Sequence, residues 1–279
     1  MIKGIKVFLY QLRKEFFTWR IFVIYVCIGI FIYSYLQPIA KMVEDVKIKA
    51  TPMAFVHLMN DYICQTIIVI GFIFMMSNAP FKGKSSHYII YRCGVKTWEV
   101  GNFIYITVNS FLYTGFLVLI SIISLFGKLD FNLENWGKIW GTLARTNASA
   151  IYGLKFSIND YLLGKYEPAA AFTMTFFLSI LCFLWIGLLI YLLNKFIFHG
   201  AGILGAGFFV FLDTMIYNMW TPWAYRFSPL TLMQLIAYTN YNKYYGLSLT
   251  YAWLFFAGCI ILFVAIMLLA PEGGDIQNE

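Results

Sequence analysis

The chain has 279 residues, of which 61% are hydrophobic and only 12% are charged, and its formal net charge is +7. Soluble domains carry about 25% charged residues, so this composition excludes an ordinary soluble domain. Several apolar runs approach the length of about 20 residues that a helix needs to cross a bilayer. We therefore predict an all-α polytopic membrane protein with a single transmembrane domain over residues 1–279.

Residues 1–19 have the pattern of an amphipathic helix that lies at the membrane surface. The apolar face of this helix carries Ile2, Ile5, Phe8, Leu9, Leu12 and Phe16. The basic face carries Lys3, Lys6, Arg13 and Lys14. Trp19 and Arg20 suit the interface that follows. No small-residue cleavage site is evident, and we expect the first span to remain as an anchor.

Six apolar runs predict six membrane spans. Their expected ranges are 21–37, 58–77, 102–126, 169–193, 201–220 and 251–270. Pro38 is expected to end the first span, because proline inside a helix removes a backbone hydrogen bond. An even number of spans places both termini on the same side of the membrane.

Two stretches between the spans differ from simple connections. Residues 127–168 are too polar to cross a membrane, but they contain apolar residues at the spacing of a surface helix. These are Trp136, Ile139, Trp140 and Leu143. Residues 221–250 are aromatic and are interrupted by prolines, which favours a short re-entrant or interfacial hairpin.

The distribution of basic residues gives the orientation. Residues 1–20, 78–101 and 194–200 carry ten Lys and Arg, and the other loops also carry ten. The first group is packed into fewer residues, and the flank before the first span outweighs the flank after it by five to three. We expect the termini and residues 78–101 in the cytoplasm, with 127–168 and 221–250 outside. The basic flanks suit anionic lipid headgroups, not nucleic acid.

The segment 78–101 has the features of a short helix set between two spans. Ser85 or Ser86 can cap this helix, Gly94 can end it, and Pro80 with Gly83 separates it from the preceding span. One interpretation is a surface on which another protein docks, and the other is a loop whose lysines only enforce orientation. The docking residues would be Phe81, Lys82, Lys84, His87, Tyr88, Ile89, Tyr91 and Arg92.

Motifs for cofactors or metals are weak in this chain. Gly83-Lys84-Ser85 is similar to the end of a P-loop, but Asn78 stands where that pattern requires glycine. The histidines are far apart, and the five cysteines are scattered without a CxxC pair. We expect no catalytic group, no metal site and no cofactor in this chain.

Polar residues within or beside the spans are the candidates for a substrate pathway. They are Asn60, Asp61, Gln65, Asn109, Asp213 and Asn218. An ionisable group inside a membrane is costly, so Asp213 marks either such a pathway or an ion pair with Arg226 or Lys243. Asn109 can form an interhelical hydrogen bond or bind a ligand. The other three near residue 60 belong to a solvated helix end or contact the substrate.

The whole architecture resembles the ABC-2 class of ABC-transporter permease subunits, particularly the small bacterial ones. The resemblance rests on the amphipathic N-terminal helix, the six spans, APFKGKSSHYIIYRCGVKTWEVGN before the third span and RFSPLTLMQL before the sixth. Arg92, Gly94, Trp98 and Gly101 match the R-x-G-x-x-x-W-x-x-G pattern that is frequent in this family. The polar stretch from Gly127 to Pro168 is long for the family.

The resemblance implies a partner ATPase that binds ATP and Mg on the cytoplasmic side of a bacterial membrane, with residues 78–101 as the coupling helix. It also implies two permease chains with a substrate path between them, lined mainly by spans two and five. The aromatic outer loops and the scarcity of charge in the spans favour export of an amphipathic peptide, lipid or drug. Two alternatives stay open: a membrane-embedded enzyme that uses Asp213, and an immunity or scaffold protein that sequesters a peptide.

Overall fold

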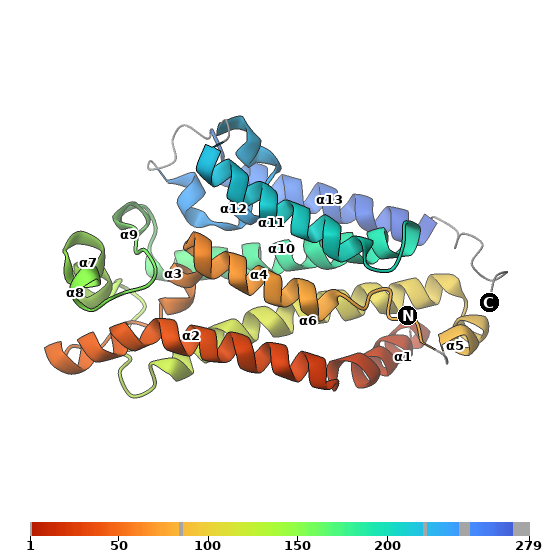
Figure 1. The fold of residues 1–279 in the computed structure, drawn as a ribbon, viewed down its shortest axis with the longest axis horizontal. Coiled ribbons are helices and arrows are strands. Elements are labelled where there is room, and N and C mark those ends of the chain that lie inside the picture. The colour runs from red at the N-terminus through yellow and green to blue at the C-terminus, as the bar shows by residue number, and fades with distance from the viewer. Residues whose placement is uncertain (1, 84–85, 220–221, 240–245, 270–279) are drawn as a thin grey trace.

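A computed structural model of the chain describes residues 2–83, 86–219, 222–239 and 246–269. Within these residues the fold is all-helical, and the extended pairing is limited to one isolated parallel bridge between Ala50 and Leu129. The main helices run side by side along the long axis of the molecule (Figure 1). They are α2 (Trp19–Val46), α4 (Tyr62–Met76), α6 (Val95–Ser124), α10 (Pro168–Phe196), α11 (Ala201–Met219) and α13 (Leu249–Leu269).

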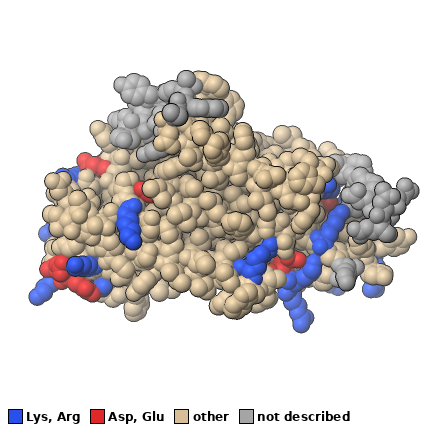
Figure 2. Space-filling view, viewed as in Figure 1, with Lys and Arg blue, Asp and Glu red and all other residues tan. Residues whose placement is uncertain are grey.

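Four of these helices, α2, α6, α10 and α13, are long and apolar enough to cross a membrane. A fifth candidate is the pair formed by α3 (Ala54–Asn60) and α4, which meet at a 90° bend. The apolar part of α11, Ala201–Ile216, is shorter. Charged side chains gather toward the two ends of the molecule and leave an uncharged band between them on the visible face (Figure 2). The protein is thus all-α, with several helices suited to a membrane.

Helix α10 forms the centre of the bundle. In its most apolar stretch of 18 residues, 72% of the residues are buried, whereas in the corresponding stretch of α13 only 17% are. Helix α10 also contacts α4, α6, α11 and α13. Glycines allow its neighbours to approach closely, as is typical of membrane helices. A Cβ added at Gly187 would lie 2.5 Å from Ile106 of α6, and one at Gly202 of α11 would lie 2.5 Å from the Ile190 carbonyl oxygen.

Helix α2 does not end at Pro38, as the sequence had led us to expect, but continues to Val46. The residues beyond the proline remain helical because Ile39, Met42 and Val43 are buried in the core. Their burial offsets the one backbone hydrogen bond that proline removes. Lys47, with φ of 55°, ends the helix.

The expected second span, 58–77, is divided at Asp61. The carboxylate of Asp61 caps α4, because Oδ1 accepts a hydrogen bond of 3.1 Å from the Cys64 backbone N–H. Asp61 itself is extended (φ −92°, ψ 128°), which turns the chain between α3 and α4. A side chain that caps a new helix thus breaks the apolar run.

The N-terminal helix α1 (Ile2–Gln11) packs against the start of α6 and continues into the π-helix η1 (Leu12–Phe16). Helix α6 begins at Val95, before the expected start at residue 102. The side of α1 that faces α6 carries Gly4, and a Cβ there would lie 3.1 Å from Val100. Ile5 and Leu9, from the predicted apolar face, are exposed. This exposure suits a helix at the membrane surface.

Short helices cover the opposite end of the bundle (Figure 1). They are α7 (Gly137–Arg145), α8 (Ala148–Ile151), α9 (Asp160–Lys165), η2 (Pro222–Phe227), α12 (Pro229–Met233) and η3 (Leu235–Tyr238). In α7 the predicted apolar side of a surface helix is buried through Ile139, Trp140 and Leu143. Residues 221 and 240–245 of the expected hairpin lie outside the described residues.

Candidate functional site

A short helix, α5 (Ser86–Cys93), lies at the same end of the bundle as α1 and the end of α13 (Figure 1). The chain turns into it through Gly83, whose N–H donates to Ser86 Oγ at 2.8 Å, while its carbonyl accepts from the Ser86 N–H at 2.8 Å. Gly94, with φ of 85° and ψ of 149°, separates α5 from α6. The helix expected in this segment is therefore present, and Ser86 is its first residue; Ser85 lies outside the described residues.

Helix α5 exposes aromatic and basic side chains. Tyr91 is 95% exposed and Tyr88 is 77% exposed. His87 and Arg92 are also exposed, and Ile89 is half-buried. Large exposed aromatics on a short polar helix are typical of surfaces that bind another protein.

The expected docking residues that precede α5 have different surroundings. Lys82 is exposed, and Lys84 lies outside the described residues. Phe81 is 1% exposed, and its ring packs edge-on against Tyr105 with the centroids 4.7 Å apart. Phe81 thus anchors the segment to α6 and contributes little to its outer surface.

Two side chains from other helices hold the turn that leads to α5. Asn194 of α10 donates through Nδ2 to the Ala79 carbonyl at 2.7 Å and accepts through Oδ1 from the Gly202 N–H at 2.6 Å. Lys14 Nζ donates to the Phe81 carbonyl at 3.2 Å. The turn is therefore attached to η1, α10 and the start of α11.

A buried polar network joins α6 to α10 beneath α5. Lys195 Nζ lies 2.9 Å from Glu99 Oε1, and both side chains are almost fully buried, at 4% and 2% exposure. The Tyr191 hydroxyl donates to Glu99 Oε2 at 2.6 Å and accepts from Asn102 Nδ2 at 2.9 Å. Gln11 of α1 donates to Asn102 Oδ1. Buried charges require such partners, so this network fixes the relative position of the three helices.

The predictions from the sequence did not include the residues of this network. A signal was present, because Glu99 and Asn102 are three residues apart and Tyr191 and Lys195 are four apart. These spacings place each pair on one face of its helix. Nothing in the sequence, however, showed that the two faces meet.

The R-x-G-x-x-x-W-x-x-G pattern has a structural reason at three of its positions. Gly94 takes a backbone conformation that is essentially restricted to glycine. The side chain of Trp98 is fully buried. A Cβ at Gly101 would lie 2.4 Å from Val7 Cγ1, so glycine is needed for α1 to lie against α6. The exposed Arg92 has no such packing role.

Replacing Gly94 with alanine is expected to destabilise the α5–α6 junction by about 1–3 kcal/mol through backbone strain. Steric overlap does not contribute, since a Cβ at this position has no atom within 4 Å. The control is Gly115→Ala inside α6, where a Cβ also has open space and alanine favours the helix by about 0.5–1 kcal/mol. Hydrogen exchange of residues 86–95 measures the effect, and equal exchange in both variants would contradict it.

Three of the expected pathway residues lie together at the opposite end of the bundle. Asn60 Oδ1 accepts from the Ile236 N–H at 2.9 Å, and Gln65 Nε2 donates to the Leu230 carbonyl at 2.6 Å. Asp61 Oδ2 accepts from the backbone N–H of Ser157 at 3.0 Å. These side chains hold α3 and α4 against the segments that contain Ser157, Leu230 and Ile236.

Asp213 of α11 is 3% exposed and accepts hydrogen bonds from the hydroxyls of Ser228 at 2.5 Å and Thr231 at 2.6 Å. Within the described part of the chain it has no ion pair with Arg226, and Lys243 lies outside that part. Its carboxylate thus attaches the irregular segment 222–233 to α11.

The remaining two pathway candidates lie elsewhere. Asn218 is exposed and donates to the Thr214 carbonyl one turn earlier in α11, at 2.7 Å. Asn109 is buried in α6 and donates to the Tyr105 carbonyl of its own helix at 2.8 Å. The structure therefore does not gather all six predicted residues into one path.

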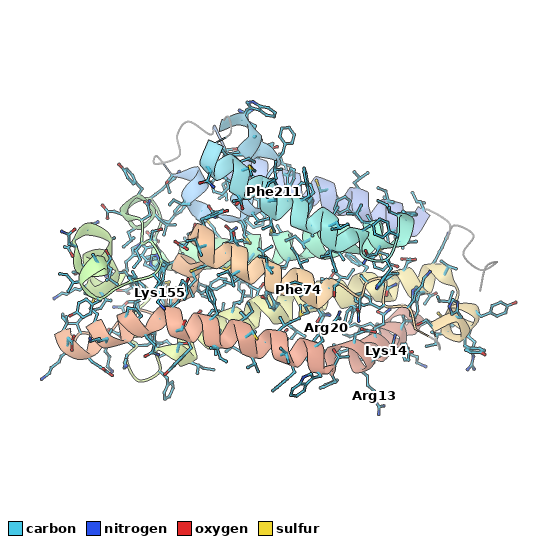
Figure 3. All side chains as sticks on the ribbon, viewed as in Figure 1. Arg13, Lys14, Arg20, Phe74, Lys155 and Phe211 are labelled. Atoms are coloured by element: carbon cyan, nitrogen blue, oxygen red, sulfur yellow. The ribbon has the colours of Figure 1, made fainter. Side chains whose placement is uncertain are left out.

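An apolar groove of about 340 Å³ lies between α4 and α11. Ile70 and Phe74 of α4 line one side, and Val210 and Phe211 of α11 line the other. Phe74 and Phe211 can be followed in Figure 3. This groove brings together the helices that correspond to the second and fifth expected spans. Comparison with protein-family models, curated proteins and solved structures gives no match to this chain.

Proposed function

We propose that this chain is the membrane-spanning permease subunit of an ATP-driven exporter, with ATP hydrolysed by a separate subunit in a bacterial cytoplasmic membrane. The observation that carries the proposal is α5, which exposes Tyr88, Tyr91 and Arg92 at one end of a bundle of apolar helices. The six proposed spans are α2, the bent pair α3 and α4, α6, α10, α11 and α13. In this orientation both termini and α5 face the cytoplasm.

The contacts around α5 support a route for mechanical coupling. A displacement of α5 by the ATPase reaches α6 through Gly94, and α6 is joined to α10 by the buried Glu99–Lys195 ion pair. The turn before α5 is bonded to Asn194 of α10. Different contacts of α5 with the ATP-bound and ATP-free states of the partner would supply the coupling free energy.

The groove between α4 and α11 is the proposed substrate surface. Its lining is almost entirely apolar, which suits the hydrophobic part of an amphipathic peptide, lipid or drug. Thr214 at the groove gives one polar contact and is itself bonded to Tyr62 at 2.5 Å. A second permease chain, identical or not, is proposed to close the groove from the open side.

Purification of the tagged chain from its native membrane tests this proposal. An ATPase subunit is expected to accompany the wild-type chain, since the aromatic face of α5 provides a docking surface. Nucleotide-independent binding of a peptide to residues 127–168 would instead support the sequestering protein, and lipid or peptide hydrolysis by the isolated chain without ATP would support the enzyme. Either result, in the absence of an ATPase, would overturn the exporter.

A further inference from the structure

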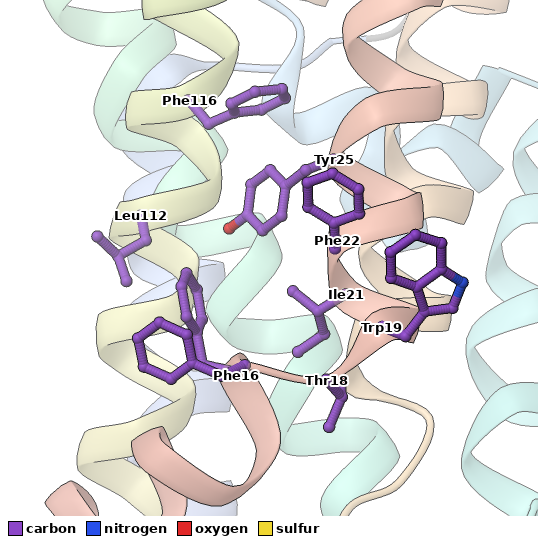
Figure 4. A pocket seen from close by; sticks show the side chains of 9 residues that line it. Phe16, Thr18, Trp19, Ile21, Phe22, Tyr25, Leu112 and Phe116 are labelled. Atoms are coloured by element: carbon purple, nitrogen blue, oxygen red, sulfur yellow. The ribbon is translucent and has the colours of Figure 1, made fainter.

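A second apolar groove lies between α2 and α6, beside the corner where η1 turns into α2. Its wider part has a volume of about 680 Å³. Among its lining residues are Phe16, Trp19, Phe22, Tyr25, Leu112 and Phe116 (Figure 4). A further hollow of about 400 Å³ shares Phe22, Tyr25 and Phe116 and extends the groove to Tyr33.

The groove is longer than the hydrocarbon of one leaflet, so an acyl chain can lie in it along its whole length. From Trp19 to Tyr33 the helix rises by about 21 Å, at 1.5 Å per residue. One leaflet contributes about 15 Å of hydrocarbon, half of the bilayer core. Trp19 is 76% exposed at the mouth, where an interfacial tryptophan is expected. The groove therefore runs from the headgroup level into the hydrocarbon.

The mouth of the groove is positively charged. Arg13 of η1, three residues before Phe16 of the groove wall, is exposed and extends away from the bundle (Figure 3). Lys3 and Lys6 are exposed farther along α1. Glu15 is the one acidic residue before Glu44 in the sequence, and it is buried and paired with Lys14 at 3.1 Å. This arrangement leaves net positive charge toward a headgroup.

The N-terminus of α2 adds to this potential. The Thr18 hydroxyl donates to the Glu15 carbonyl at 2.8 Å, and among the described residues its side chain does not cap α2. The first N–H groups of a helix carry partial positive charge, which favours an anion nearby. The helix end and the basic side chains thus favour the same kind of ligand.

Tyr25 offers a hydrogen bond inside the groove. Its hydroxyl is buried and has no partner within the described ranges. Figure 4 shows the ring between α2 and α6, with the hydroxyl directed across toward α6 and toward the end of the groove that Phe16 lines. Helical side chains tilt toward the N-terminus of their helix, which brings the hydroxyl toward the headgroup level. An ester carbonyl of a phospholipid is the acceptor available there.

We propose that this groove is a specific site for an anionic phospholipid of the cytoplasmic leaflet. One acyl chain lies between α2 and α6, an ester carbonyl accepts the hydrogen bond from Tyr25, and the headgroup faces Arg13 and the start of α2. The lipid would hold the corner between η1 and α2 in place. The assignment to the cytoplasmic leaflet rests on the orientation proposed above. The site itself does not depend on transport, because none of its residues belongs to α5 or to the α4–α11 groove.

Binding of phosphatidylglycerol to the delipidated full chain in detergent, followed by native mass spectrometry, tests the site. Phosphatidylcholine with the same acyl chains is the reference lipid. Gly29→Leu places a side chain in the groove. Each methylene of the lipid that this side chain displaces is expected to lower the affinity about fourfold. Gly258→Leu on α13 is the control, because a Cβ there has open space and Gly258 lines neither groove. We expect tighter binding of phosphatidylglycerol, loss of this preference in Gly29→Leu and no change in Gly258→Leu.

Two conservative variants test the polar contacts without filling the groove. Tyr25→Phe is expected to weaken phosphatidylglycerol binding about fivefold, the value of one hydrogen bond, while the lipid-free protein keeps its stability. Arg13→Gln is expected to reduce the preference for phosphatidylglycerol over phosphatidylcholine. Lys49→Gln, at the other end of the bundle, is expected to leave this preference unchanged. Equal binding of both lipids, or unchanged affinity in Tyr25→Phe, would overturn the site. The site would also be overturned if an amphipathic peptide displaced phosphatidylglycerol and phosphatidylcholine equally well.

Discussion

Replacing Lys195 with methionine is expected to cost about 3–5 kcal/mol of folding free energy, because it leaves the Glu99 carboxylate buried without its cation. The two side chains are 4% and 2% exposed and their charged atoms are 2.9 Å apart. Water therefore cannot replace the lost partner, and the link between α6 and α10 is weakened. Chemical unfolding in detergent, followed by tryptophan fluorescence, measures the change.

The matched control is Arg145→Ala, which breaks the ion pair with Asp160. Those side chains are 63% and 48% exposed, so the expected cost is about 0–1 kcal/mol. The double variant Glu99→Gln/Lys195→Met is expected to regain much of the lost stability, because it buries no charge and the glutamine can still accept from Tyr191. If the double variant is as unstable as Lys195→Met, the charge left on Glu99 is not the cause.

Replacing Tyr88 and Arg92 together with alanine is expected to abolish the stimulation of ATP hydrolysis by the permease. Both side chains are exposed on α5, so the folding free energy should change by only about 0.5 kcal/mol. The ATPase would lose an aromatic and an arginine contact, the residue types that dominate most protein interfaces. The ATPase rate of the co-expressed complex in proteoliposomes, compared with the ATPase subunit alone, measures the effect.

The control for this pair is Tyr161→Ala/Arg145→Ala, which removes the same residue types from exposed positions at the other end of the molecule. It is expected to leave the stimulated rate unchanged. Membrane insertion of both double variants should equal that of the wild type. Full stimulation in Tyr88→Ala/Arg92→Ala would contradict the coupling role of α5, and equal loss in both variants would show that the effect is not specific to it.

Local sequence features predicted much of the fold, and the places where these predictions were wrong have physical causes. The apolar runs placed α10 and α13 within a few residues of their observed bounds. Glycine and proline around α5 separated it correctly from its neighbours. The expectations at Pro38 and across Asp61 were wrong because the effects of these two residues depend on packing. The proline is held in α2 by buried residues beyond it, and the aspartate caps a new helix inside an apolar run.

The candidate sites divide in the same way. The exposed residues of α5 were predicted from its composition, whereas the buried ion pair joins residues 96 positions apart and was not foreseen. The expected pathway residues Asp61 and Asp213 bond to the irregular segments between the long helices, through Ser157 and Ser228. Their hydrogen-bond partners follow them by 96 and 15 residues, which no local spacing rule relates.

The sequence by itself determined that the chain is built of apolar helices with a short aromatic and basic helix between two of them. Both features follow from local requirements, since a span needs continuous apolar residues and a helix end needs a cap or a glycine. Only the tertiary structure decided that Glu99 meets Lys195 beneath α5 and that α2 and α6 leave a groove beside Tyr25. Such pairings depend on the close packing of whole helices, which sets the neighbours of each buried group.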